Sequence, residues 1–516
     1  MDDCISALNY ELPEISVGYE TQSVNDGNAE NFNFKNNING FNVNFGYKNI
    51  DFGNYDIPSG AILHEEEDHD DHDEDEHHDE DMGFLNNSDY AVEATKFGIS
   101  KVGDWGYVGF SVDNLESVYG IPFHGDEHGD EHGDEEEHDE HGEERIFSTT
   151  DSESFTIKGS YNINGSLINK IDFNYRDSDY SLTEAHEEEE HHEEDEHDEE
   201  EEHEEHAPTV FMNEAVEYGA TFDISNDSST QKVVVNFVDE DNSIVGEEAF
   251  MNPANSKEFT IGYYLSKDLG IYDLDIGFRH DQIERSGSVS EEEHGDHHDD
   301  DHGDDHGDEH EDEHGEVDYY NIDDSTNSFA VTLGRSLTDN LGVSLGYASV
   351  ERLPSSIELF MNGPHMATGR FEVGDPNLNS ETSNNFDITF NFDNGDFYAY
   401  ASFYITDVDN YIALIDEEED HMDEEEHHED EDEHHEDEDE HHEDEHDDHG
   451  HGNLIHANYM QEDAEFDGYE IEFGRSFDLG SGELALSFGR DVVNAEFADG
   501  HYVPRINPAR NIYSLV

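Results

Sequence analysis

Hydrophobic and polar residues alternate with a period of two through most of the chain. In residues 41–48, Phe, Val, Phe and Tyr occupy the odd positions, while Asn, Asn, Gly and Lys occupy the even ones. The same alternation recurs in residues 155–161, 167–176, 272–279, 329–335 and 483–489. Side chains of a β-strand point to alternate faces, whereas a helix has a period near 3.6 residues. The pattern therefore predicts an all-β protein whose strands have one apolar and one polar face.

The connections between these strands alternate in length. Short turns rich in Gly, Asn and Asp are each followed by a longer loop, and they lie around residues 39–40, 103–104, 164–165, 226–228, 268–270, 339–340, 394–395 and 480–481. Successive connections of an up-and-down antiparallel sheet lie at opposite ends, so this asymmetry indicates a transmembrane antiparallel β-barrel with long extracellular loops. The alternative is a soluble β-sandwich or propeller, which would need an apolar core where these strands carry Asn, Ser, Asp and Gly.

We expect about eighteen strands, from near Glu14 to residues 511–516, and the longer ones can cross a tilted bilayer. Because a barrel in lipid must close to leave no unpaired edge, we expect further strands after Val516. The chain has no apolar run long enough for a transmembrane helix. Its first sixteen residues lack the basic and apolar regions of a signal peptide.

The charge is concentrated in five segments that all fall in the longer loops. The formal net charge is −119, and residues 64–81, 124–144, 184–206, 291–316 and 416–452 hold about 80 of the 139 acidic residues and 33 of the 37 histidines. Such a chain repels nucleic acid and anionic membrane surfaces, so cations are its expected ionic partners. The single cysteine, Cys4, excludes an internal disulfide and a cysteine-based zinc site, and we interpret it as an incidental thiol.

Carboxylates and imidazoles without thiolates form a ligand set that suits Zn²⁺, with Ni²⁺, Cu²⁺, Mn²⁺ and Ca²⁺ as competitors. A solvated anionic brush and calcium bridging of surface loops are alternatives, but a brush does not explain why histidine is almost the only residue interleaved with the acids. Capture should weaken in mild acid, when protons compete for imidazole. The candidate ligands in the acidic segments are His124, His128, His132, His186, His191, His192, His294, His297, His298, His427, His428, His434, His435, His441 and His442.

One long loop is not acidic and carries an ordered motif. Residues 351–390 read ERLPSSIELFMNGPHMATGRFEVGDPNLNSETSNNFDITF. This stretch resembles a signature of TonB-dependent outer-membrane receptors, with weaker similarity at VYGIPFH (118–124) and YVPRINPAR (502–510). The matching positions are Arg352, Pro354, Ser355, Glu358, Leu359, Phe360, Gly363, Pro364, His365, Ala367, Thr368, Phe371, Glu372, Gly374, Asp375, Pro376, Leu378, Glu381, Ser383 and Asn385.

Within that family, the Gly-Pro-His loop and the His-rich acidic loops resemble the zinc-uptake receptors. The resemblance implies a 22-stranded barrel filled by an N-terminal plug, in the outer membrane of a Gram-negative bacterium. Residues 14–516 would then be an incomplete barrel with its signature loop at 351–383, and residues 1–13 a remnant of the linker from the plug. It also implies a monomer in outer-membrane lipid, with zinc as substrate and coupling to the TonB–ExbB–ExbD complex through the plug.

His365 and Glu372 are the candidate ligands of a tighter site, because both lie in the signature loop and outside the acidic segments. The alternative for His365 is a histidine that only packs the loop. We find no catalytic constellation or phosphate-binding loop in the sequence, so we expect a transporter and no catalytic cofactor. The remaining alternatives are import of another metal or a metal complex, such as haem or a siderophore, and a surface cation-binding barrel without transport.

Overall fold

The computed structural model describes residues 4–58, 83–122, 145–187, 208–290, 317–417 and 454–516, except residues 164, 166, 247, 248, 366, 367 and 481. The acidic segments lie almost entirely outside these ranges. Among the described residues, no helix has the length and apolar character needed to cross a membrane.

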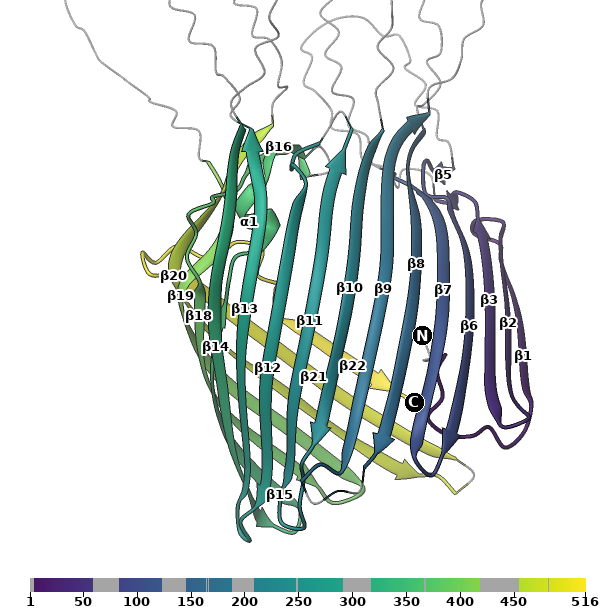
Figure 1. Cartoon of the computed structure of the whole chain (residues 1–516), viewed down its shortest axis with the longest axis vertical. Helices are drawn as coiled ribbons and strands as arrows, with labels where there is room; N and C mark the ends of the chain where they lie inside the picture. Colours follow the sequence, from purple (N-terminus) through teal and green to yellow (C-terminus); the bar gives the residue numbers. More distant parts are fainter. Residues whose placement is uncertain are drawn as a thin grey trace, which may run out of the picture.

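A large curved antiparallel sheet forms the body of the molecule (Figure 1). Its eighteen long strands are β1 (Glu14–Gln22), β2 (Gly27–Ile38), β3 (Phe41–Phe52), β6 (Tyr90–Gly103), β7 (Gly106–Gly120), β8 (Arg145–Asn162), β9 (Lys170–Glu187), β10 (Thr209–Asp223), β11 (Thr230–Val245), β12 (Ala254–Asp268), β13 (Asp273–Ser290), β14 (Val317–Thr338), β15 (Leu341–Arg352), β18 (Glu381–Asp393), β19 (Phe397–Asp416), β20 (Ile455–Asp478), β21 (Glu483–Phe497) and β22 (Arg510–Leu515). The predicted all-β class, barrel architecture and approximate strand number are confirmed.

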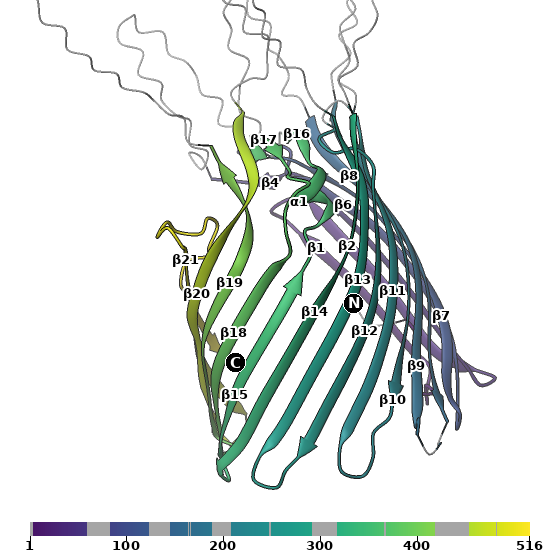
Figure 2. The ribbon, with the colours of Figure 1, turned by 60° about the vertical axis from the view of Figure 1, so that its left-hand side comes forward.

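Each long strand pairs antiparallel with the next long strand along the chain. Figure 2 shows the sheet curling around an interior. Among the described residues, β1 pairs only with β2, and β22 pairs only with β21. A separate hairpin of β4 (Tyr55–Asp56) and β5 (Phe84–Leu85) lies between β3 and β6 in the chain.

The two faces of the strands divide as the alternation predicts. Phe41 on β3 is 41% exposed, whereas Asn42 and Asn44 on the opposite face are 2% and 5% exposed. Aromatic rings also contact one another across strands on the outward face, as where Phe155 lies 6.4 Å from the ring of Tyr175. The inner face borders a cavity of about 770 Å³ whose charged lining residues are Lys96, Asp113, Lys158, Asp172, Arg176 and Glu217. A wet polar interior and an apolar exterior fit a strand that faces lipid on one side.

The short turns lie at one end of the sheet, as predicted. In three of them an Asp carboxylate accepts a hydrogen bond from the backbone N–H two residues later: Asp268 from Gly270, Asp393 from Gly395 and Asp478 from Gly480. The strand ends that flank the five acidic segments lie at the other end. The asymmetry is incomplete, because residues 23–26 form a short connection at the loop end.

The N-terminal segment Cys4–Tyr10 lies against the inner face of β3 and β6. Ser100 donates a hydrogen bond to the carbonyl of Ser6 at 2.7 Å, and Asn42 donates to the carbonyl of Leu8 at 2.9 Å. A Cβ at Gly98 would lie 2.3 Å from the carbonyl oxygen of Cys4, so the close approach requires glycine there. Cys4 is buried by this packing.

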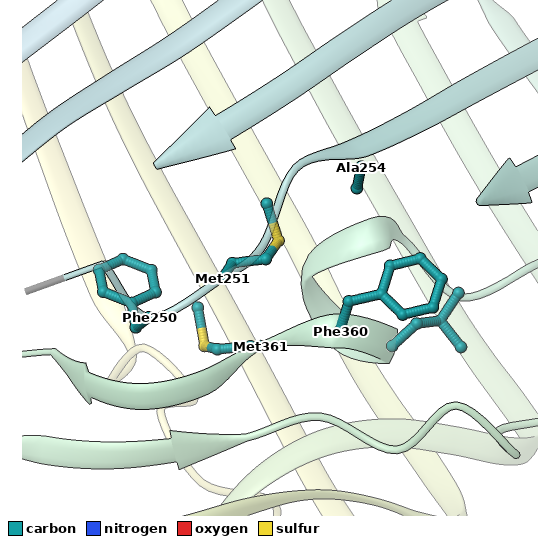
Figure 3. Packing of buried hydrophobic residues seen from close by; sticks show 6 residues of the cluster. Phe250, Met251, Ala254, Phe360 and Met361 are labelled. Carbon is teal, nitrogen blue, oxygen red and sulfur yellow. The ribbon is translucent and has the colours of Figure 1, made fainter. Parts of the chain in front are cut away.

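The signature loop, for which no secondary structure was predicted, contains regular elements: helix α1 (Ser356–Phe360) and a hairpin of β16 (Asn362–His365) and β17 (Arg370–Val373). Figure 2 shows them at the loop end of the sheet. They pack through an apolar cluster formed by Phe250, Met251, Ala254, Leu359, Phe360 and Met361 (Figure 3). Phe360 is fully buried against Gly287 on the inner face of β13, where an added Cβ would lie 2.5 Å from its ring. The loop is therefore anchored to the inner wall at the barrel mouth.

Candidate metal site at the barrel mouth

Helix α1 is fixed at its start by a reciprocal capping interaction. The Ser355 hydroxyl accepts from the backbone N–H of Glu358, and the Glu358 carboxylate accepts from the backbone N–H of Ser355 at 2.7 Å. Glu358 also accepts from Arg352 at 2.9 Å, and Arg352 donates to Glu381 on β18 at 3.0 Å. Burial alone would lower the pKa of the Arg352 guanidinium, but the hydrogen bonds to these carboxylates outweigh it and raise the pKa. The network joins α1 to both neighbouring barrel strands.

His365 and Glu372, the two residues that the sequence singles out in this loop, are in contact. The Nδ1 atom of His365 lies 3.1 Å from Oε1 of Glu372, which also accepts from the Thr368 hydroxyl at 2.8 Å. Glu372 is 4% exposed, and the His365 side chain is 26% exposed. Among the described residues, the other ring nitrogen of His365, Nε2, makes no hydrogen bond. A carboxylate on Nδ1 fixes the ring orientation and leaves Nε2 as the atom that can bind a metal.

Aromatic side chains surround this pair. The imidazole of His365 lies over the ring of Phe250, with centroids 4.6 Å apart and an interplanar angle of 31°. Tyr459 packs against the same apolar cluster, and its pKa is raised by burial and, to a lesser extent, by the charges of Glu372 and Glu358. The contact with Phe250 makes the position of His365 depend on the packing of the cluster.

The hairpin that carries the pair is tied to β19 and β20 of the barrel wall. Strand β17 pairs in parallel with the start of β20, and the backbone N–H of Ile455 donates to the carbonyl of Gly369 at 3.1 Å. Arg370 donates through Nε and Nη2 to the two carboxylate oxygens of Asp416, at 2.7 and 2.9 Å. The hydrogen bond from Arg370 lowers the pKa of Asp416 below its ordinary value. These ties join the two strand ends that flank residues 418–453 to the hairpin of His365.

The other predicted ligands are not brought to this site by the described residues. The backbone of His186 lies in β9 opposite Ile146, and its side chain lies outside the described part. Fourteen further histidines lie wholly outside it: His124, His128, His132, His191, His192, His294, His297, His298, His427, His428, His434, His435, His441 and His442. Within the described ranges, no group of three or more His, Cys, Asp or Glu side chains is placed to hold a metal. In this arrangement Nε2 of His365 offers one ligand, and Glu372, predicted as a second ligand, instead orients the ring through Nδ1, so a complete site needs further ligands.

Sequence reasoning missed several residues around this pair. The hydroxyl of Thr368 bonds both the carbonyl of His365 and the carboxylate of Glu372. His456 stacks on Phe371 with centroids 5.2 Å apart, and Arg370 pairs with Asp416. Thr368 was noted as a matching position of the motif but was given no role at the site, and Arg370 could have been noted from its place in the same motif. The partners on β19 and β20 could not, because they meet the hairpin only through the fold.

Solved structures share this fold at low sequence identity. The Copper transporter OprC matches with a TM-score of 0.63 and 11% identity over 98% of this chain and 66% of that one. The FrpB iron transporter from Neisseria meningitidis matches with a TM-score of 0.58 and 11% identity, over 95% of this chain and 64% of that one. The Serratia marcescens hemophore receptor HasR, in complex with its hemophore and heme, matches with a TM-score of 0.59 and 11% identity. That match covers 97% of this chain and 70% of HasR. The chain thus spans about two thirds of the length of these proteins.

The match to a family model agrees with the fold and with the motif in residues 351–390. The model is described as TonB dependent receptor-like, beta-barrel, and it matches residues 11–513. This range includes the whole signature loop and every long strand except the last two residues of β22. The chain therefore belongs to the TonB-dependent receptor β-barrel family, whose members lie in the outer membrane of Gram-negative bacteria.

Proposed function

We propose that this protein is a TonB-dependent receptor that captures and imports a divalent metal ion, with zinc as the substrate. The observation that carries the proposal is the His365–Glu372 pair at the barrel mouth, where Nε2 of His365 makes no hydrogen bond to any described residue. Imidazole nitrogen is a preferred zinc ligand, and a carboxylate on the other ring nitrogen increases its basicity and fixes its direction. The apolar ring of Phe250 behind the imidazole limits its rotation.

The acidic segments have a different role in this proposal. Their carboxylates and imidazoles raise the local cation concentration above the mouth, and many weak sites favour rebinding over escape. Zinc then passes to Nε2 of His365, and the remaining ligands come from a part of the protein outside the described residues. Further transport requires a plug that the TonB–ExbB–ExbD complex rearranges. The position of Cys4–Tyr10 on the inner wall supports a role for residues 1–13 as the connection from the plug to the barrel.

Two alternatives remain open to experiment. The solved structures of similar fold include a copper transporter, an iron transporter and a hemophore receptor, which favours testing other metals and metal complexes. A surface barrel that binds cations without transport would also use the acidic segments. It would not require an oriented histidine inside the mouth.

A zinc titration of the purified protein against a competing chelator tests the proposal. The acidic segments supply many weak sites, so the informative quantity is the number of tight sites per chain. We expect His365→Ala to remove one tight site and His456→Ala to retain it, because the His456 ring stacks on Phe371 and, among the described residues, forms no hydrogen bond or ion pair with Glu372. Equal numbers of tight sites in the wild type and in His365→Ala would refute the assignment. Repeating the titration with Cu²⁺ and Ni²⁺ tests the metal preference.

A further inference from the structure

A guanidinium group lies beside the proposed metal site, although a cation site would ordinarily exclude it. Arg370 is directly opposite His365 in the β16–β17 hairpin, so their side chains share one face. Glu372 is two residues further along β17 and lies on that same face. The charges of Arg370 and Glu372 interact. An unpaired guanidinium here would repel an incoming metal and would compete with the His365 imidazole for the Glu372 carboxylate.

Asp416 holds this guanidinium in a defined place. Both of its carboxylate oxygens accept from Arg370, through Nε and Nη2, and the Nη1 atom of Arg370 donates to the carbonyl of Thr368 at 2.9 Å. Each nitrogen of the guanidinium is therefore engaged away from Glu372. The bidentate geometry fixes the plane of the group as well as its charge.

We propose that Asp416 is a positioning and specificity residue for metal binding, which neutralises Arg370 and keeps its guanidinium off the His365–Glu372 pair. The proposal rests on the proposed function, because it assigns a role toward the same site. Asp416 is the last residue of β19 and lies close to residues 418–453 in the chain, so the proposal places one determinant of cation binding at this strand end. The ligand is a bare divalent cation or the metal centre of a small complex, and in either case a free positive charge on Arg370 opposes binding.

The proposal predicts effects of opposite sign for the two partners. Removing the charge of Asp416 releases Arg370 and should weaken metal binding by about tenfold, which is the size expected for one charge acting on a divalent ion at side-chain distance in largely aqueous surroundings. Removing Arg370 instead should leave binding unchanged or tighter. A purely structural clamp predicts that both changes weaken binding alike, since either one breaks the same two hydrogen bonds.

The experiment is a Zn²⁺ titration of the purified full chain against a competing chelator, for five variants beside the wild type. We expect Asp416→Asn to lose about tenfold in affinity at the tight site, and Arg370→Gln and the double variant Asp416→Asn/Arg370→Gln to bind at least as tightly as the wild type. Glu417→Gln is the matched control, because it removes the same charge at the next residue, where the carboxylate accepts from Asn458 and not from Arg370. We expect less than a twofold effect there.

The results separate the failure of this inference from the failure of the proposed function. The role of Asp416 would be overturned if Glu417→Gln lost as much zinc affinity as Asp416→Asn. It would also be overturned if Arg370→Gln lost as much affinity as Asp416→Asn. The fifth variant, His365→Ala, reports on the site itself. If it retains the tight zinc site, both the proposed function and this inference are wrong. The heat-modifiable mobility of each variant on gels confirms that its barrel is folded before affinities are compared.

Discussion

Replacing Phe360 by alanine should release the signature loop from the barrel wall without unfolding the barrel. The ring of Phe360 is fully buried and covers Gly287 on β13, and its centroid lies 6.3 Å from that of the Tyr320 ring. Truncating a buried phenylalanine costs about 3–5 kcal/mol in lost burial and cavity formation. Because about 1.4 kcal/mol corresponds to a factor of ten, the ratio of seated to released loop should fall by a factor of about 10² to 4 × 10³.

Hydrogen exchange measures this change segment by segment, since exchange from a locally opened region reports its own opening free energy. We expect loss of protection in residues 356–373 and weaker zinc binding at His365, whose ring lies over Phe250 in the same cluster. Ile357→Ala is the control on the same helix, because that side chain is 46% exposed and should change little. Unchanged protection in Phe360→Ala, or equal loss across β6–β13, would show that the cluster does not anchor the loop.

Three further predictions concern charges. Arg352→Gln should lower the opening free energy of α1 by about 1 kcal/mol, a modest effect because the guanidinium is 40% exposed. Hydrogen exchange of the α1 amides measures this free energy, and no change would mean that the capping interaction alone holds the helix. Four exposed carboxylates lie opposite one another on the outer face, in the order Glu153, Asp179, Glu214 and Asp241. Since like charges opposite one another repel by about 0.2–1 kcal/mol per pair, added NaCl should raise the thermal unfolding midpoint, and Glu214→Gln should reduce that dependence. Arg370 lowers the pKa of Asp416, so the ion pair is fully formed above the ordinary value of 3.8 and is lost only as pH falls through the lowered value. The affinity ratio of wild type to Asp416→Asn should therefore stay constant from pH 7.5 to 5.5 while zinc capture itself falls, and a ratio that collapses in this range would contradict the assignment.

Much of the barrel was predictable because its signal is local and repeated. The alternation in residues 41–48 already separates Phe41 on the outer face from Asn42 on the inner face, and the Asp–Gly turns mark one end of the sheet. The elements of the signature loop were not predicted, because a five-residue helix is too short to show a period. Its one local signal is the spacing of Ser355 and Glu358, which forms the capping interaction.

The candidate site was only partly predictable for a related reason. His365 and Glu372 lie seven positions apart in one motif, so their contact could be expected from the sequence. Arg370 and Asp416 are 46 positions apart in the sequence. They meet because β17 pairs in parallel with the start of β20, which lies beside the end of β19 that carries Asp416. The alternation gives the face of each residue on a strand, but it carries no information about which distant strand a loop will contact.

Zinc accumulation by intact cells tests the central claim most directly. Cells that express the gene, cells in which it is deleted and cells that carry the His365→Ala variant would be compared at limiting labelled zinc, with and without excess unlabelled Zn²⁺, Cu²⁺ or Ni²⁺. Uptake that depends on the gene and on His365, and that unlabelled zinc suppresses more than copper or nickel does, is the predicted result. Zinc accumulation equal in all three strains, or import unaffected by excess zinc, would contradict the account.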